Sequence, residues 1–239
     1  HVPTVEDVFE HVEWRKAMFG VVPVENSLEG VVTRTLDRFF NFWDTPVQIY
    51  GEIEQPIQHC LIFRPQTPME KIGIVYSHPQ ALAQCKRWLD DHYPRAVRRE
   101  RDSTADSVRD LLDEKEKLWS MDQRAAIGRQ ELAREYGLKW IPIPIDEENR
   151  TRFLILSRKS PRSGRRNKTS LMVALKDRPG ALHDILVPFK TYGINLTKIE
   201  SRPTKRKAWE YVFFIDLEGH KSELRIRKAL AALEKRTSD

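Results

Sequence analysis

The sequence predicts an α/β protein with a smaller α+β module at its carboxyl end, and three observations indicate this fold class. Short apolar runs alternate with amphipathic helical patterns through residues 1–158, which is typical of an α/β domain with a largely parallel sheet. Residues 159–168 are rich in Lys, Arg, Ser, Pro and Gly and lack apolar periodicity, so we expect a solvated linker there. Strand and helix patterns resume over residues 169–239, which favours two separate cores in this chain of 239 residues.

The first expected elements belong to one lobe of the α/β domain. Thr4 and Asp7 have the spacing of a capping box and predict a helix over residues 5–17, followed by a strand over residues 19–24. From about Ser27, apolar and aromatic side chains recur at helical spacing and predict a second helix with a buried aromatic face. Two further strands are expected near residues 47–53 and 57–63.

The alternation restarts at Lys71 and predicts a second lobe. Its expected strands cover residues 72–76, 96–101 and a short run near Ala125, and its expected helices cover residues 79–92, 104–117 and 130–136. Gly137 suits a left-handed cap, and the alternating prolines of residues 141–145 suit an extended crossing back to the first lobe. We therefore expect lobe one to contain about residues 1–66 and 146–158, and lobe two about residues 67–145.

The last module has the pattern of most of a βαββαβ unit. Its expected elements are, in order, a strand over residues 170–175, a helix over 181–192, strands over 195–200 and 209–217, and a helix over 223–233.

Composition limits the function classes. The formal charge of +6 permits nucleic-acid binding, but the basic residues are spread along the chain and the basic linker has no aromatic residue to stack on bases. No apolar stretch approaches the ~20 residues that span a bilayer, and the amino terminus does not resemble a signal peptide, so we expect a soluble cytoplasmic protein. Cys60 and Cys85 lack metal-ligand spacing, and we expect buried, reduced thiols and no metal or cofactor.

Four polar segments have the character of ligand-facing turns. Thr151 and Arg152 open an apolar strand, and the other three segments, residues 25–30, 77–82 and 102–107, lie between an expected strand and an expected helix. Helix amino termini present unpaired N–H groups and bind anions such as carboxylates. The alternative is helix capping, because Asn26 with Glu29, Ser77 with Gln80 and Ser103 with Asp106 all have capping spacing.

These segments also carry a family resemblance. The runs at residues 20–27, 77–85, 103–105, 125–127 and 149–153 resemble, in order and spacing, the motifs of prephenate dehydratase. After the linker, residues 177–182, 193–197 and 200–203 resemble the ACT regulatory domain that this family carries. The resemblance covers nearly the whole chain. It implies a catalytic domain over residues 1–158 with two lobes like those of type II solute-binding proteins, and a ferredoxin-like ACT domain over residues 169–239.

The resemblance implies the conversion of prephenate to phenylpyruvate, carbon dioxide and water, without a metal or organic cofactor. The family's essential threonine falls on Thr151, whose hydroxyl is a weak acid and is expected to hydrogen-bond the departing hydroxyl or relay a proton. His78 is the second candidate for proton transfer, and Arg152 is expected to hold a substrate carboxylate. The expected substrate-binding residues are Asn26, Ser27, Gln80, Ser103, Thr104, Ala105, Arg152 and Phe153.

For the ACT domain the resemblance implies feedback inhibition by L-phenylalanine, bound across a dimer interface of a homodimer or homotetramer. The expected effector-binding residues are Gly180, Ala181, Leu182, Asn195, Glu200, Ser201, Arg202 and Pro203. The alternative is that residues 177–180 form an ordinary turn.

Two other functions stay open at this point: arogenate dehydratase, and a non-catalytic protein that binds an amino acid. Compared with the family pattern, we expect an amino-terminal strand and loop to be missing before His1, and a last ACT strand to be missing after Asp239. The motifs do not decide whether a chorismate mutase domain lies upstream.

Overall fold

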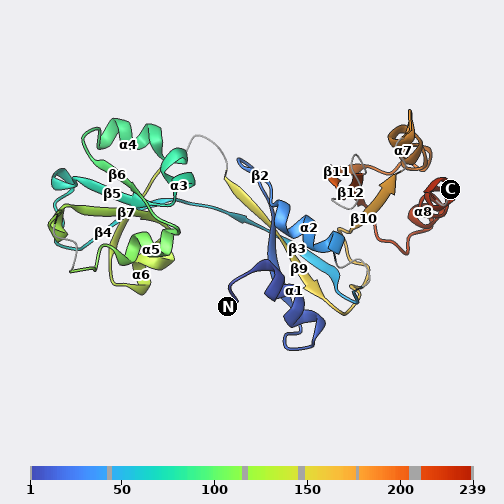
Figure 1. Cartoon of the computed structure of the whole chain (residues 1–239), viewed down its shortest axis with the longest axis horizontal. Helices are drawn as coiled ribbons and strands as arrows, with labels where there is room; N and C mark the ends of the chain where they lie inside the picture. Colours follow the sequence, from blue (N-terminus) through green and yellow to red (C-terminus); the bar gives the residue numbers. More distant parts are fainter. Residues whose placement is uncertain are drawn as a thin grey trace. The chain divides into compact units, whose positions relative to one another are not determined.

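The computed structural model describes residues 2–41, 45–114, 118–144, 149–175, 178–204 and 211–237 (Figure 1). The chain divides into two compact units. Unit 1 contains His1–Glu25, Val31–Ile53 and Arg152–Asp239, and unit 2 contains Asn26–Gly30 and Glu54–Thr151. The chain therefore leaves unit 2 for the last time between Thr151 and Arg152. Unit 2 also starts earlier than the expected residue 67, because a strand near residue 60 pairs within its sheet.

Unit 2 contains a five-stranded sheet of order β6-β5-β7-β4-β8. The strands are β4 (Cys60–Phe63), β5 (Ile74–Ser77), β6 (Val97–Glu100), β7 (Arg124–Gly128) and β8 (Lys139–Pro142). Strand β5 is parallel to β6 and β7, but β4 is antiparallel to β7 and β8. The expectation of a largely parallel sheet is thus wrong. Helical crossovers join β5 to β6 and β6 to β7, and these are the strands that run in parallel.

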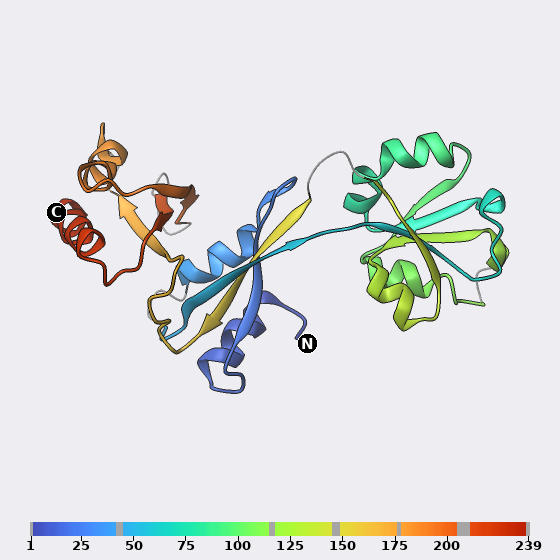
Figure 2. The same ribbon diagram turned by 180° about the vertical axis from the view of Figure 1, so that it is seen from behind.

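Helices cover both faces of this sheet, with α3 (Pro79–Gln84) and α4 (Lys86–His92) on one face and α5 (Thr104–Arg109) and α6 (Gln130–Glu135) on the other (Figures 1 and 2). Two hydrophobic cores correspond to the two faces. The helix expected over residues 79–92 is divided at Cys85, which ends α3 and begins α4. Single 3₁₀ turns at Met69–Lys71 and Met121–Gln123 complete the described helical elements of the unit.

A four-stranded sheet of order β2-β1-β9-β3 lies mainly in unit 1. The strands are β1 (Gly20–Asn26), β2 (Gly30–Val31), β3 (Gln48–Pro56) and β9 (Arg150–Ser157), and the helices are α1 (Val5–Glu13) and α2 (Thr33–Asn41). The Thr4 and Asp7 capping box is confirmed, but α1 ends early, just before Arg15 adopts a left-handed backbone with φ of 60°. The helix expected from Ser27 is present as α2, with Phe39 and Phe40 packed on the core, but it begins only at Thr33 because a tight turn and β2 precede it.

The carboxyl-terminal module has the expected βαββα order. It consists of β10 (Lys168–Leu175), α7 (Ala181–Thr191), β11 (Leu196–Pro203), β12 (Tyr211–Glu218) and α8 (Leu224–Thr237). The strands form an antiparallel sheet of order β10-β12-β11, and both helices share one core with it. Val212 and Phe214 instead join the core of α1, α2, β1 and β9, so the other face of this sheet packs within unit 1.

Several expectations fall partly outside the described residues. These are the carboxyl end of the helix expected over 104–117, the end of the crossing at 141–145, the turn at 177, and the start of the strand expected at 209. Residues 158–167 contain no helix or strand, and β10 begins at Lys168, the last residue of the expected linker. Among the described helices, none is long and apolar enough to cross a membrane.

Candidate active site

The turn after β1 fixes the orientation of the Asn26 carboxamide. Its Oδ1 accepts the backbone N–H groups of Leu28 at 3.0 Å and Glu29 at 3.1 Å. Both partners can only donate, so the oxygen of Asn26 faces the turn and its Nδ2 faces away from it. The Asn26 and Glu29 spacing therefore serves a turn between two strands, and Gly30 with φ of 83° supplies the left-handed residue that this turn needs.

Asn26 and Ser27 hold the beginning of β9. Asn26 Nδ2 donates to Thr151 Oγ1 at 2.9 Å and to Asn149 Oδ1 at 2.8 Å. Ser27 donates its backbone N–H to Arg150 O at 2.9 Å, and its Oγ accepts the Arg150 N–H at 2.9 Å. Because the half-buried Thr151 hydroxyl accepts from Asn26, its own hydrogen is not used in that bond and can be donated elsewhere.

The hydrogen-bonded chain continues from Asn149 to an acidic side chain. Asn149 Nδ2 donates to Gln84 Oε1 at 3.0 Å, and Gln84 Nε2 donates to Glu29 Oε1 at 2.9 Å. Gln80 Nε2 donates to the other oxygen, Glu29 Oε2, at 2.6 Å. We call the residues of this chain the carboxamide chain; they are Asn26, Glu29, Gln80, Gln84, Asn149 and Thr151.

The sequence did not identify four of the residues in or beside this chain as site residues. Glu29, Gln84 and Asn149 lie inside the polar segments or motifs of the sequence. Their carboxamide and carboxylate groups were the only feature that could have identified them as site residues. His59, whose Nε2 lies 2.6 Å from Gln84 Oε1, is a lone histidine before a buried strand, and no local pattern distinguishes it from a core residue.

Two other predicted segments lie at the carboxyl ends of the parallel strands β5 and β6, where they cap helices. His78 Nδ1 accepts the Gln80 N–H at 3.3 Å and caps α3. Ser103 Oγ accepts the Asp106 N–H at 3.0 Å and caps α5, whose first residues are Thr104 and Ala105. Within the described residues, no hydrogen bond joins any of these side chains to Thr151.

Ser77 does not cap α3, contrary to the expected pairing with Gln80. Its Oγ donates to Ile127 O at 2.9 Å, and the side chain is completely buried between β5 and β7. The cap therefore moves by one residue to His78, because the strand continues through Ser77.

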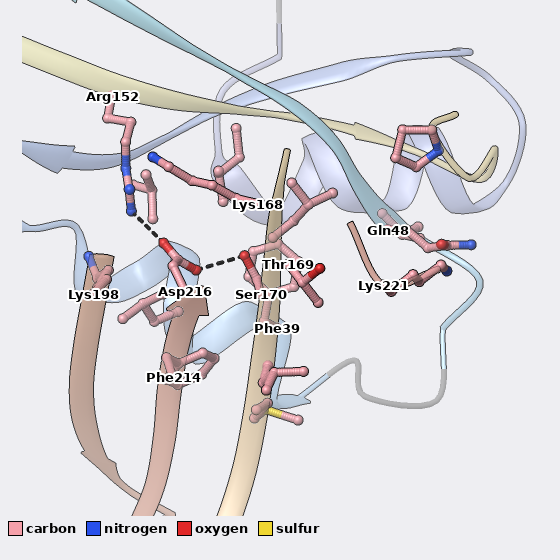
Figure 3. Close-up of a pocket in the computed structure, with 18 of the residues that line it drawn as sticks. Phe39, Gln48, Arg152, Lys168, Thr169, Ser170, Lys198, Phe214, Asp216 and Lys221 are labelled. Carbon is pink, nitrogen blue, oxygen red and sulfur yellow. Dashed lines mark hydrogen bonds and ion pairs between the residues drawn. The ribbon is translucent and has the colours of Figure 1, made fainter. Parts of the chain in front are cut away.

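Arg152 is used differently from the expected carboxylate clamp. Its guanidinium pairs with Asp216 at 3.0 Å (Figure 3), with Glu25 at 3.3 Å and with Glu52 at 3.7 Å. The Arg152 side chain is 12% exposed. Successive residues of a strand point to opposite faces, so Arg152 faces away from Thr151. The half-buried Phe153 lies on the same face as Thr151. Because three carboxylates of the protein surround the Arg152 guanidinium, we assign it no role in holding the substrate.

A cavity of about 360 Å³ lies next to Arg152 in unit 1. Apolar side chains such as Phe39 and Phe214 line it together with Lys198 (Figure 3). Lys198 is itself paired with Glu25 at 3.1 Å. The cavity therefore lies beside an ion-pair network and not beside the Thr151 hydroxyl.

The predicted effector residues lie on two parts of the carboxyl-terminal module. Gly180 adopts a left-handed backbone with φ of 79° and opens α7, followed by Ala181 and the exposed Leu182. The rest lie just before or along β11, and are Asn195, Glu200, Ser201, Arg202 and Pro203. Arg202 pairs with Asp37 of α2 at 2.9 Å, an ion pair that sequence reasoning did not anticipate.

Both cysteines are buried free thiols, as expected. Burial, and secondarily the neighbouring Cys60, raises the pKa of the Cys85 thiol to about 12. Burial is also the main cause that raises the pKa of Cys60. No group of His, Cys, Asp and Glu side chains that could hold a metal ion occurs in the described part of the chain.

Comparison with known proteins decides the family. The family model described as prephenate dehydratase matches residues 1–161, and the model described as ACT domain matches residues 169–235. The chain belongs to the prephenate dehydratase family. The carboxyl-terminal module is therefore an ACT domain.

Relatives within the prephenate dehydratase family are similar along almost the whole chain. A bifunctional chorismate mutase/prephenate dehydratase of Aquifex aeolicus is 44% identical over 98% of this chain and 62% of its own length. A prephenate dehydratase of Methanocaldococcus jannaschii is 38% identical over 98% of this chain and 82% of its own length. The chain thus spans about three fifths of the first of these relatives.

A solved prephenate dehydratase structure, from Arthrobacter aurescens in complex with L-Phe, has a TM-score of 0.87 and 35% identity, and covers 99% of this chain and 77% of that one.

Proposed function

We propose that this chain catalyses the decarboxylating dehydration of prephenate to phenylpyruvate, a step of L-phenylalanine biosynthesis. Family membership supports the reaction class. The observation that carries the mechanism is the bond from Asn26 Nδ2 to Thr151 Oγ1, because it leaves the Thr151 hydrogen available to a leaving group.

The reaction breaks two bonds of the substrate ring. The electron pair of the bond between the ring and its carboxylate moves into the ring as carbon dioxide leaves, and the bond to the ring hydroxyl breaks as that group departs with its electron pair. The departing hydroxide takes one proton and becomes water, so the dianionic substrate and one proton yield monoanionic phenylpyruvate, carbon dioxide and water. Aromatisation of the ring supplies the driving force.

In this proposal Thr151 donates a hydrogen bond to the departing oxygen as negative charge develops on it. A threonine hydroxyl is too weak an acid to hold a free proton for transfer near neutral pH, so hydrogen-bond donation, or relay of a proton from another group, is the favoured role. Substrate carboxylates would be met by the hydroxyl, carboxamide and N–H groups around the starts of α3 and α5, where Gln80 and Ser103 lie.

Removal of the Thr151 hydroxyl tests this function. We expect Thr151→Val to lower kcat for phenylpyruvate formation at least ~100-fold, because one charge-stabilising donor is lost, and Thr151→Ser to keep part of the activity. Thr191→Val, on the exposed surface of α7, is the matched control and should leave kcat unchanged. Near-normal turnover by Thr151→Val would rule out the assignment.

The same assays distinguish the alternatives. Turnover of arogenate in preference to prephenate would reassign the substrate, and amino-acid binding without turnover of either compound would favour a non-catalytic binding protein.

We further propose that the two units correspond to the lobes of a type II solute-binding fold, and that L-phenylalanine binds the ACT domain as a feedback inhibitor. The L-Phe complex of the Arthrobacter aurescens relative supports the second point.

A further inference from the structure

His59 takes no part in the proposed chemistry, yet it contacts the carboxamide chain. It directly precedes β4, it is only 7% exposed, and its Nε2 lies 2.6 Å from Gln84 Oε1. Its backbone is held as well, because its carbonyl accepts the Ile143 N–H at 2.9 Å and the Gln58 side-chain amide at 3.1 Å. The ring therefore occupies a defined position against Gln84.

The direction of the hydrogen bonds follows from the Asn26 end. Backbone donors fix Asn26 Oδ1, so Asn26 Nδ2 donates to Asn149 Oδ1. Asn149 Nδ2 is then the atom that faces Gln84, and it donates to Gln84 Oε1. Because the Gln84 atom beside His59 is an acceptor, the Nε2 of His59 must carry the hydrogen of their 2.6 Å contact.

The other ring nitrogen agrees with this tautomer. His59 Nδ1 is fully buried, and no polar atom of the described residues bonds to it. A hydrogen on Nδ1 would be a buried donor without an acceptor, which costs more than an unused lone pair. The geometry thus favours a ring with its hydrogen on Nε2.

We propose that His59 is a positioning residue that holds the Gln84 carboxamide in one orientation, and with it the hydrogen-bond direction that presents the Thr151 hydrogen. This inference rests on the function proposed above. If Gln84 were flipped, its NH₂ group would face the donors of His59 and Asn149, and its oxygen would face the Glu29 carboxylate. Asn26 and His59 therefore fix the direction of the chain from its two ends.

Two substitutions separate hydrogen bonding from packing. His59→Leu removes the donor and keeps an apolar side chain, whereas His59→Gln places an amide nitrogen at about the reach of Nε2. We expect His59→Leu to lower kcat for prephenate about 10-fold, the equivalent of one lost hydrogen bond, with KM changed less than about 2-fold. His59→Gln should stay within about 3-fold of the unsubstituted chain.

His92→Leu is the matched control, because His92 is exposed on α4 and its ring bonds locally, to Trp88 O. It should leave both kinetic constants unchanged. An unchanged kcat in His59→Leu, or equal losses in His59→Leu and His59→Gln, would overturn the positioning role.

A second measurement does not depend on turnover or on the folding of a variant. In the unsubstituted full chain, nitrogen chemical shifts of the His59 ring should show the hydrogen on Nε2. A hydrogen on Nδ1 would contradict the inference even if the enzyme is fully active. If the chain instead turns over no prephenate while the Nε2 tautomer is found, the proposed function fails and the orientation of Gln84 stands.

Discussion

At the residue scale, one carboxamide determines how the Thr151 hydroxyl is presented. The Asn26 oxygen accepts from two turn N–H groups, and its nitrogen donates to two side-chain acceptors. These four hydrogen bonds fix the orientation of the carboxamide. The carboxamide chain joins residues that are far apart in sequence, such as Asn26 and Thr151, which are separated by 125 positions. Local spacing therefore identified the polar segments, whereas the bonds between them depend on the order of strands in the sheet.

Asn26→Asp tests this donor without removing the turn. The new carboxylate keeps the acceptors for Leu28 and Glu29 but cannot donate to Thr151, and it would repel Asn149 Oδ1. We expect kcat for prephenate to fall ~100-fold in steady-state assays, with the thermal midpoint lowered only modestly. Gln66→Glu, which adds the same charge at an exposed turn position of unit 2, should change neither; a fully active Asn26→Asp would refute the role of the donor.

The buried thiol of Cys85 makes the free energy of unfolding depend on pH in the alkaline range. Its pKa is raised to about 12 in the folded state, so the folded chain binds a proton that the unfolded chain, with an ordinary thiol, releases above pH 9. The contribution of Cys85 to the free energy of unfolding is therefore fully present below pH 9. It is lost as the pH rises towards 12, by up to about 1.4 kcal/mol per pH unit.

Denaturant titrations of the unsubstituted chain and of Cys85→Ala at pH 8 to 11 measure this effect. The free energy of unfolding should fall more steeply with pH in the unsubstituted chain than in the variant. Identical slopes would show that Cys85 does not titrate as described.

At the element scale, β9 has different partners on its two sides. Thr151 belongs to the carboxamide chain in unit 2. The next residue, Arg152, pairs with Asp216 on β12 of the ACT domain (Figure 3), and also with Glu25 and Glu52. The expectation that both residues address the substrate followed from their adjacency, and the alternation of a strand separates them. The strand itself, the capping box of α1 and the left-handed Gly137 were predictable because they depend on nearest neighbours alone.

Asp216→Asn tests the contribution of this ion pair to the packing of the ACT domain. Both partners are largely buried, with side chains 12% and 15% exposed, so breaking the pair should destabilise the protein by about 2 kcal/mol in urea unfolding. Asp184→Asn is the matched control, since its pair with Arg178 is 52% and 36% exposed and should contribute less than about 0.5 kcal/mol. Equal small effects would show that the Arg152 network does not hold the two sheets together.

At the scale of the whole molecule, most of β9 and the ACT domain belong to the same unit. The open face of the ACT sheet packs through Val212 and Phe214 onto the core that contains β9, and Arg202 and Lys198 of β11 pair with Asp37 and Glu25. A change in the ACT sheet therefore has a direct physical route to the strand that carries Thr151.

L-phenylalanine should act through this route. We expect L-phenylalanine to lower the rate of phenylpyruvate formation and to raise the thermal midpoint, since a ligand that binds the folded state stabilises it. D-phenylalanine is the control and should do neither. In Asp216→Asn, binding measured by calorimetry should persist while inhibition weakens; unchanged inhibition would argue against transmission through Arg152.

Residue patterns along the chain predict which segments form helices and strands in most of it, where the linker and the ACT domain lie, and which polar turns are candidate site segments. These features depend on periodicity, turn chemistry and motifs, which are local properties of the chain. Tertiary structure alone decided that β4 runs antiparallel, that Arg152 pairs with carboxylates of its own unit, and that His59, Gln84 and Asn149 connect to Thr151. Those outcomes depend on which side chains, distant in sequence, lie opposite one another. The arrangement of strands in the sheets determines these pairings.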